Sequence, residues 1–390
     1  MRCVCGTVLV AVCALAAPAA AQEYKCATAA EIRAALAKAG PGDLIAVKPG
    51  DYDMGGEFAT GRDGAPDKAV TLTCEGARGY ARLRVSGQIG FRVRHRHWTL
   101  CGIHLEGDPQ KTEVPLYVDG QGGGGDLLVT DCRVSGSSQC LIQASRSRDK
   151  AASNITVEFS EFFDCQGSAL NLFAGDNWVI RRNYIHDYGK GGAVSYGVAL
   201  KGGGKNGVIE ANLVDANGQA TTLGISFGGG LSPDGNRPLD ADGKPGPEQD
   251  AGICRNNIVI GTSDMPYHTN KAAGCRFLNN LAWGASGFQR QNAAGADPVL
   301  LNNLIGGSPK GIAAESKNNL SPVKREWFLK PEALDFRLSE DGKKELGGKG
   351  EVVLGNPEDF FGAKRDPAKP GLGPVLPDAK ESTKWVDRRK

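Results

Sequence analysis

One lysine stands where an apolar strand would otherwise end. Residues 197–204 read GVALKGGG, so Lys201 follows an aliphatic run and precedes three glycines. In a strand with a period of two, Val198 and Leu200 point to one face and Ala199 and Lys201 to the other, so we expect the lysine to face solvent. Lysine becomes a base when its surroundings lower its pKa, because only the neutral amine accepts a proton. Lys201 is therefore the first candidate for chemistry.

Other segments align with this strand and provide neighbours for the lysine. They read CLIQAS, ALNLFA, GISFGG, PYHTNK, GFQRQN and GIAAES. Their second positions are apolar and predict a column that faces the core, namely Leu141, Leu170, Ile225, Tyr267, Phe288 and Ile312. The third and fifth positions then lie outward, which places His268 two coils, or roughly 10 Å, from Lys201. The same face carries side chains that suit a sugar chain: Asn171, Phe173, Ser226, Asn270, Gln289 and Gln291.

These residue types fit the cleavage of a uronate-containing polysaccharide by elimination. The reaction needs a base for the C5 proton, a group that neutralises the carboxylate and a donor for the leaving oxygen. We expect Lys201 to be the base. The donor is His268 or one of two tyrosines in the loop before the lysine, Tyr188 or Tyr196. Hydrolysis instead requires two carboxylates that flank the scissile bond. The outward face offers no such pair, although loop carboxylates such as Asp187 and Asp264 keep hydrolysis open.

The chain contains a repeat of about 23 residues. Six segments start at Ile155, Val179, Val208, Ile253, Arg276 and Val299, so their spacings are 24, 29, 45, 23 and 23 residues. In the last five segments a short apolar alternation is followed by an asparagine: Asn183, Asn212, Asn257, Asn280 and Asn303. Asparagine tolerates left-handed backbone angles and can hydrogen-bond a copy of itself in the next repeat. Coils stacked ~4.8 Å apart would bury a continuous apolar face, so the pattern predicts a solenoid.

A solenoid with an asparagine column resembles the right-handed parallel β-helices of the pectate-lyase-like group. Residues 29–52 are similar to the capping helix and first strand of such proteins, with Thr28 and Glu31 as a capping box and Gly40 as the helix stop. The segment DFFGAKRDPAKPGLGP, from Asp359, is similar to the end of secreted members. The resemblance implies an all-β, single-stranded right-handed parallel β-helix with an N-terminal capping helix, at residues 22–365, followed by a polar tail at 366–390.

Within this group the layout most resembles the alginate lyase and chondroitinase B family. In that family an arginine ends the strand at the place of VALKGG, and a lysine lies one coil earlier. Here Lys201 stands in the place of the arginine, and Phe173, Ala174 and Gly175 stand in the place of the lysine, so the catalytic pair is not carried over. Another β-helix pectate lyase family, which uses a single lysine with calcium, is similar in combining a lysine with aspartates. The resemblance implies an acidic polysaccharide as the substrate.

Three aspartates are candidates for a calcium site. Asp164, Asp187 and Asp215 stand at matching places where the second strand of a coil ends. Stacked carboxylates repel one another unless a cation, a lysine or water intervenes, which keeps Ca²⁺ open as a cofactor. Aspartate is also a common turn residue, which is the alternative interpretation. An insertion at residues 228–252 is interpreted as a lid, a partial calcium loop or a mobile excursion, and it carries Asp234, Asp240, Asp242, Glu248 and Asp250.

A basic run, RLRVSGQIGFRVRHRH at residues 82–97, indicates either a solvated edge or a patch for an anionic polymer. Over the whole chain the charges nearly balance, with a net charge of +2 in 390 residues. Totals of this kind describe a large soluble protein, so we expect neither nucleic acid as a partner nor insertion into a membrane.

The N-terminus predicts secretion. Residues 1–21 combine an early arginine, a short apolar run and the small residues Ala19, Ala20 and Ala21, as in a signal peptide cut after Ala21. No later stretch approaches ~18 uninterrupted apolar residues, so we expect the protein to be free in the periplasm or outside the cell. We also expect a monomer. The eight cysteines after the leader are even in number, which leaves disulfides open in an oxidising compartment.

The leading hypothesis is a secreted polysaccharide lyase that cleaves an acidic glycan by β-elimination. The alternatives are a non-catalytic β-helix that binds glycan or serves as an envelope scaffold, and a glycoside hydrolase or epimerase on the same fold, because folds of this kind host many activities. Formation of an unsaturated uronate separates the first hypothesis from the others, since only elimination produces it.

Overall fold

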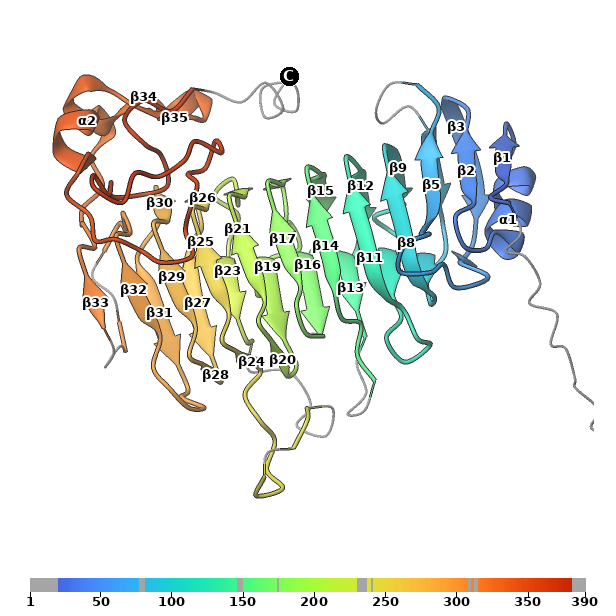
Figure 1. Cartoon of the computed structure of the whole chain (residues 1–390), viewed down its shortest axis with the longest axis horizontal. Coiled ribbons are helices and arrows are strands. Elements are labelled where there is room, and N and C mark those ends of the chain that lie inside the picture. The colour runs from blue at the N-terminus through green and yellow to red at the C-terminus, as the bar shows by residue number, and fades with distance from the viewer. Residues whose placement is uncertain are drawn as a thin grey trace, which may run out of the picture.

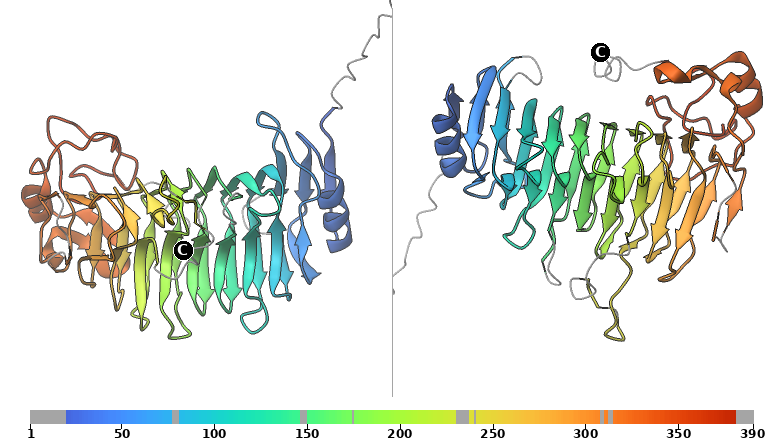
Figure 2. Two further views of the ribbon diagram at one scale, coloured as in Figure 1. Left: turned by 90° about the horizontal axis from the view of Figure 1, so that it is seen from below. Right: turned by 180° about the vertical axis from the view of Figure 1, so that it is seen from behind.

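The computed structural model describes residues 20–76, 81–145, 150–173, 175–229, 237–239, 241–307, 310–311 and 315–380. Most of the predicted leader and the end of the predicted tail lie outside these ranges, as do Asp234, Asp240 and Ile312. The described chain coils into a solenoid with three long sheets, in which successive coils pair their strands in parallel (Figure 1). The sheets keep this stacking along the length of the molecule (Figure 2).

Most coils add one strand to each of the three long sheets, which we call A, B and C. Sheet A contains β1 (Glu23–Cys26), β2 (Leu44–Val47), β5 (Val70–Cys74), β8 (Arg96–Cys101), β11 (Gly125–Thr130), β14 (Ile155–Glu158), β17 (Val179–Arg181), β21 (Val208–Glu210), β25 (Ile253–Arg255), β29 (Arg276–Leu278), β32 (Val299–Leu301) and β33 (Ser316–Lys317). Sheet B contains β3 (Gly50–Gly55), β6 (Ala81–Val85), β9 (Ile103–Gly107), β12 (Arg133–Ser137), β15 (Glu161–Cys165), β18 (Tyr184–His186), β22 (Leu213–Asp215), β26 (Ile258–Ile260) and β30 (Leu281–Trp283).

Sheet C, which carries the predicted site, contains β4 (Phe58–Ala59), β7 (Ile89–Val93), β10 (Val114–Val118), β13 (Cys140–Ala144), β16 (Ser168–Phe173), β19 (Ser195–Lys201), β23 (Thr222–Phe227), β27 (Tyr267–Asn270) and β31 (Phe288–Gln291). A small parallel sheet lies beside it and contains β20 (Gly204–Lys205), β24 (Gln249–Asp250) and β28 (Ala272–Ala273). The C-terminal segment adds one antiparallel pair, β34 (Phe328–Lys330) with β35 (Asp335–Leu338).

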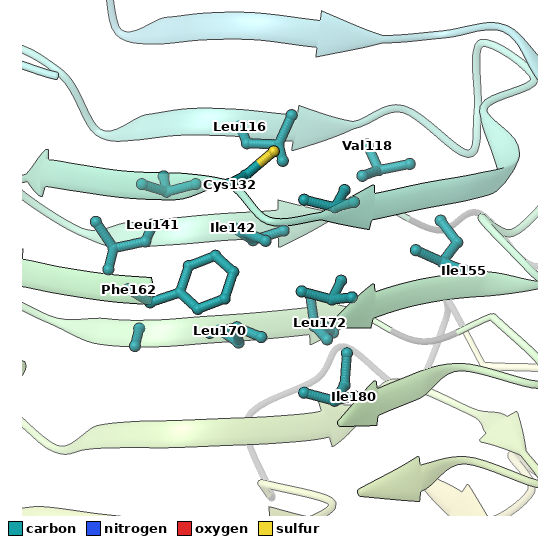
Figure 3. Close-up of a cluster of buried hydrophobic side chains, with 14 of the residues drawn as sticks. Leu116, Val118, Cys132, Leu141, Ile142, Ile155, Phe162, Leu170, Leu172 and Ile180 are labelled. Atoms are coloured by element: carbon teal, nitrogen blue, oxygen red, sulfur yellow. The ribbon is translucent and has the colours of Figure 1, made fainter. Parts of the chain in front are cut away.

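The strands form because apolar residues alternate with polar ones and point into the coil. β5, with the sequence VTLTC, buries Val70, Leu72 and Cys74 and leaves its two threonines half-buried. A single apolar core fills the coils from one end of the solenoid to the other. Figure 3 shows the middle of this core, where Phe162 of sheet B lies among aliphatic side chains such as Leu170 of sheet C. No coil could bury this surface alone, so the stack is the folding unit.

The predicted capping helix is confirmed. At the start of α1 (Ala29–Lys38), the hydroxyl of Thr28 accepts the backbone N–H of Glu31 at 3.2 Å, and the carboxylate of Glu31 accepts that of Ala27 at 2.7 Å. The helix covers the first coil with its apolar face. Neither α1 nor α2 (Glu340–Leu346), the two α-helices of the described residues, is long and apolar enough to cross a bilayer.

The asparagine column is confirmed as a ladder at the turn between sheets A and B. Each asparagine accepts, at its Oδ1, the backbone N–H of the ladder residue in the preceding coil, over 2.9–3.0 Å. A serine and a cysteine continue the ladder toward the N-terminus. The ladder contains Cys132, Ser160, Asn183, Asn212, Asn257, Asn280, Asn303 and Asn319.

The left-handed corner of each turn lies one residue before the ladder position. These corner residues have φ between 53° and 60°, and they are Arg182, Ala211, Asn256, Asn279 and Asn302. The prediction that the ladder asparagines serve through left-handed tolerance is therefore wrong. The ladder position needs asparagine because its amide both accepts and donates inside the turn, where water does not reach.

The C-terminal segment folds back over the outward face of sheet B at the far end of the solenoid (Figure 1, upper left). Its apolar side chains form one cluster with Leu213, Ile258 and Leu281 of sheet B. Leu372 and Val375, in the predicted polar tail, are buried in the same cluster, because the chain returns to the solenoid there. Sheet C is not part of this cluster, so the segment leaves the predicted site uncovered.

Candidate active site on sheet C

The register of sheet C places the predicted outward residues in two neighbouring rows. The first row contains, strand by strand, Asn171, Ala199, Ser226, His268 and Gln289. The second row contains Phe173 and Lys201 and, two strands further on, Asn270 and Gln291. Lys201 and His268 thus share one face, two strands apart, as the alternation predicts. One coil differs by a residue, since Ile142 and not Leu141 pairs with Leu170.

Lys201 is buried, and the prediction that it faces open solvent is wrong. The residue is 4% exposed, and every residue of β19 is buried. Gly228 and Gly229 follow β23 directly beside the end of β19, where Gly228 N donates to Leu200 O at 2.7 Å. Near the other end of the insertion, Glu248 O accepts the N–H of Gly203 at 2.8 Å. A side chain on Gly229 would begin 3.5 Å from Lys201 Nζ, so the glycine lets this backbone approach the amine closely.

Two aromatic rings surround the amine of Lys201. Its Nζ lies 4.9 Å from the ring centre of Phe173 and 5.4 Å from that of Tyr196, within the range of a cation–π contact. Within the described part of the chain, Nζ makes no hydrogen bond or ion pair. Burial lowers the pKa of Lys201, and the negative charge of Glu248 opposes this shift only in part. The site therefore shifts the balance toward the neutral amine, which is the form that acts as a base.

Tyr196 belongs to β19 itself and not to the loop before it. It is 5% exposed and packs in an outward apolar cluster with Ala199, Leu223 and Met265. Burial raises the pKa of Tyr196, and the charges of two nearby carboxylates raise it further. Its phenol therefore keeps its proton at neutral pH and can serve as a proton donor beside Lys201.

His268 is held by hydrogen bonds at both ring nitrogens. Ser226 Oγ lies 2.5 Å from Gly228 O and 2.9 Å from His268 Nδ1. Because a carbonyl can only accept, the hydroxyl donates to Gly228 and receives the proton of Nδ1. Nε2 faces Gln291 Oε1 at 3.3 Å, and Asn270 donates to the same oxygen at 3.2 Å. Burial lowers the pKa of His268, and the bond to Gln291, which requires a proton on Nε2, raises it.

Some of the predicted sugar-binding side chains already hydrogen-bond within the protein, and others do not. Ser226 and Gln291 each contact one ring nitrogen of His268, and Asn270 donates to Gln291, so these three side chains are already engaged. The ring of Phe173 faces Lys201, as described above. Asn171 is different, because its Oδ1 is buried and has no hydrogen-bond partner among the residues that the structure describes. Gln289 is half-buried, and its backbone forms an isolated parallel β-bridge with Lys310 at the end of the sheet.

Glu248 is a member of the site that the sequence did not distinguish. It is completely buried, and its Oε2 accepts the backbone N–H of Gly229 at 2.9 Å. Its charge acts on both Lys201 and Tyr196. In the sequence Glu248 is one of several acidic residues in a Gly- and Pro-rich insertion. The one sequence signal for its position is the pair Gly228 and Gly229, because glycines permit a close approach of two backbones.

The three aspartates do not form the predicted calcium site. Asp164 pairs with Lys190 at 2.7 Å, and Asp187 pairs with His186 at 2.9 Å. Asp215 lies opposite His186 and is thus one residue out of line with the other two aspartates. Asp164 and Asp187 have φ of 61° and 51°, so they occupy turn corners, which is the alternative interpretation. No group of three or more His, Cys, Asp or Glu in the described ranges is arranged to hold a metal ion.

The predicted basic run is not one patch. Arg84 points outward from sheet B and pairs with Glu106 at 3.0 Å, whereas Arg92 belongs to sheet C and pairs with Glu57 at 2.6 Å. Arg96 belongs to sheet A and pairs with a third carboxylate. The run is divided among three sheets because the chain turns twice within it. Carboxylates pair with its arginines, so the described surface carries no patch for an anionic polymer there.

The described cysteines form no disulfide bond with one another. Seven of the eight are buried. Burial raises the pKa of Cys132 to about 12, and it raises that of Cys165 to the same value. They pack as small apolar residues, and the disulfides that the even count left open do not form.

Comparison with known proteins places the chain in a family. Residues 116–325 match the family described as "Right handed beta helix region", which is more than half of the chain. The chain belongs to the right-handed β-helix family. The predicted fold and the resemblance to the pectate-lyase-like group are thus confirmed. No curated protein sequence matches the chain.

Several solved structures share the β-helix at low identity. Pectate lyase Pel9A is 16% identical over 88% of this chain and 90% of its own, with a TM-score of 0.62. The PL6 family polysaccharide lyase Pedsa3628 from Pseudopedobacter saltans is 14% identical over 77% of this chain and 92% of its own, with a TM-score of 0.42. An alginate lyase from Paenibacillus sp. str. FPU-7 is 15% identical over 77% and 98%, with a TM-score of 0.40. The likeness to Pel9A shows a common fold.

Proposed function

We propose that the protein is a polysaccharide lyase that cleaves an acidic, uronate-containing glycan by β-elimination, with Lys201 as the base. The environment of this lysine carries the proposal. Its amine is buried between two aromatic rings and makes no hydrogen bond or ion pair within the described part of the chain. Burial disfavours the ammonium form and the charge of Glu248 offsets this only in part, so the site promotes the neutral amine that proton abstraction needs. Pectate lyase Pel9A has the same β-helix fold.

Each side chain has one task in this reaction. The amine of Lys201 takes the C5 proton of the uronate, the electron pair left behind forms the C4–C5 double bond, and the bond from C4 to the leaving oxygen breaks. The ammonium that forms then lies beside the substrate carboxylate and compensates its charge. Tyr196 gives its phenolic proton to the leaving oxygen, since its raised pKa keeps it protonated. His268 and Asn171 bind the neighbouring sugar units.

The substrate reaches Lys201 only when the backbone at Gly229 moves away from β19. A polymer cannot contact a residue that is 4% exposed, and Gly229 covers the amine. Glu248 holds this cover through its own backbone oxygen and through its side chain. A uronate carboxylate can replace the charge of Glu248 beside Lys201 and Tyr196, so binding of an acidic substrate and displacement of the insertion favour each other.

The same burial favours a second candidate function, a non-catalytic β-helix that binds glycan or serves as an envelope scaffold. In that case Lys201 is a packed residue and no substrate reaches it. For either function the predicted leader implies that the protein acts in the periplasm or outside the cell.

The deciding experiment is incubation of the purified chain with alginate, pectate, glycosaminoglycans and bacterial exopolysaccharides, with ultraviolet absorbance as the readout for unsaturated uronate. On a substrate that is cleaved, Lys201→Ala is expected to lower turnover by ~10²-fold or more. Lys205→Ala is the matched control, because Lys205 is an exposed lysine four residues further along. Absence of product on every polymer would favour the scaffold, and full turnover by Lys201→Ala would remove the lysine from the mechanism.

A further inference from the structure

A pocket lies at the turns between sheets B and C, near the end of the solenoid, and the proposed elimination does not use it. Its volume is about 600 Å³, and it is lined by Thr262, by residues 282–286 and by parts of the two following turns. This volume falls within the range of small-molecule sites, about 300–1,000 Å³.

One wall of the pocket contains a hydroxyl that has nothing to bond to. Thr262 is 5% exposed, and its Oγ1 is buried with no hydrogen-bond partner among the described residues. Buried polar atoms are almost always paired, since an unpaired one costs stability. A ligand that brings a hydroxyl or a carbonyl into the pocket would supply the missing bond.

A second wall is an aromatic ring whose orientation is fixed from behind. The ring of Trp283 makes edge-on contacts with Phe328 at 5.8 Å and with Phe336 at 5.9 Å between ring centres. These contacts come from the C-terminal segment, which therefore holds the indole in place at the pocket. A flat, half-buried indole presents an apolar surface of the kind on which the C–H face of a pyranose ring packs.

The pocket lining carries no charge. Threonine, alanine, tryptophan, glycine, serine, proline and valine make up all of its lining residues. A carboxylate placed here would lose water without gaining a charged partner, which is strongly unfavourable. The lining therefore selects a neutral ligand, in contrast to the acidic glycan proposed for sheet C.

We infer that this pocket binds a neutral sugar residue. The indole of Trp283 packs against the ring, and Thr262 Oγ1 hydrogen-bonds one of its hydroxyls. The inference needs neither Lys201 nor His268, so it stands whether or not the chain is a lyase.

The test uses the purified chain and four small probes. The methyl pyranosides of glucose, galactose and mannose are neutral, and methyl glucuronide is the charged counterpart. Saturation-transfer NMR detects contact, and a titration followed by tryptophan fluorescence measures affinity. Thr262→Val removes the hydroxyl with little change in shape, and we expect it to weaken binding of the neutral probe by about 3- to 10-fold.

Thr269→Val is the matched control, because Thr269 is also a buried threonine whose Oγ1 lacks a partner among the described residues, but it lies in β27 and not in the pocket. It is expected to leave affinity unchanged. Both variants should fold, since each removes an unpaired hydroxyl. Saturation transfer from a neutral probe that Thr262→Val weakens and Thr269→Val does not would support the inference. No transfer from any neutral probe, equal binding of methyl glucuronide, or affinity untouched by Thr262→Val would overturn it.

Discussion

The ladder at the turn between sheets A and B makes a quantitative prediction at Asn257, in its middle. The Oδ1 of Asn257 accepts both the backbone N–H and the side-chain N–H of Asn212 at 3.0 Å. Its Nδ2 donates to Ile209 O at 2.8 Å and to Asn280 Oδ1 at 3.1 Å. Asn257→Leu keeps the size of the side chain and removes all of these bonds.

The expected loss of stability follows from these contacts. The backbone N–H of Asn212 is left buried without an acceptor, which costs about 1–3 kcal/mol. Two acceptors, Ile209 O and Asn280 Oδ1, each lose a donor, at roughly 0.5–1.5 kcal/mol. Burial of the leucine offsets roughly 1 kcal/mol of this sum. We therefore expect Asn257→Leu to lower the free energy of unfolding by about 1–5 kcal/mol.

Urea unfolding followed by circular dichroism measures the total, and hydrogen exchange at the amide of Asn212 measures the local part. Asn319→Leu is the matched control, because Asn319 is half-buried at the end of the ladder, where water can replace the lost bonds. It should cost about half as much or less. If Asn257→Leu is as stable as the parent, or if Asn319→Leu costs as much, the ladder does not contribute as this reasoning requires.

Two further predictions concern pH. On any substrate that the chain cleaves, kcat/KM should rise with pH through the lowered pKa of Lys201, because only the neutral amine is a base; a rate that falls over that range would exclude this role. The second concerns His104, whose pKa is lowered to about 4 by burial, with a smaller contribution from Arg133. The folded value lies below the ordinary value of 6.5, so stability is full above pH 6.5 and is lost as the pH falls toward 4, by up to about 3 kcal/mol. His104→Gln, which does not titrate, should flatten the urea midpoint over this range, and an unchanged slope would contradict the assignment.

The solenoid and the rows of sheet C were predictable because both rest on periodicity. The spacing of Asn257, Asn280 and Asn303 sets the length of a coil. Once the coils are aligned, a period of two decides which side chains share a face, and this places Lys201 and His268 together. The register in the structure confirms both steps.

Periodicity fails where neighbouring positions are chemically alike or where the chain leaves the repeat. Leu141 and Ile142 are both apolar and both buried, so alternation cannot decide which of them faces Leu170. The insertion follows no period, and its return over β19, which buries Lys201, depends on contacts such as Gly229 with Glu248 that join residues far apart in the chain. Only the folded backbone reveals them.

The ladder also determines how the length of this protein can change. Asn257 bonds to Asn280, and Asn280 to Asn303, each across 23 residues, and every asparagine offers the same acceptor to the rung before it. Loss or gain of one whole coil would bring an identical asparagine into the vacant place, whereas loss of a single residue inside a strand would turn the side chains that follow in that strand to the wrong face. The coil, and not the residue, is thus the step by which this half of the chain can grow or shrink. Toward the N-terminus, where Ser160 and Cys132 replace asparagine, coils are no longer interchangeable.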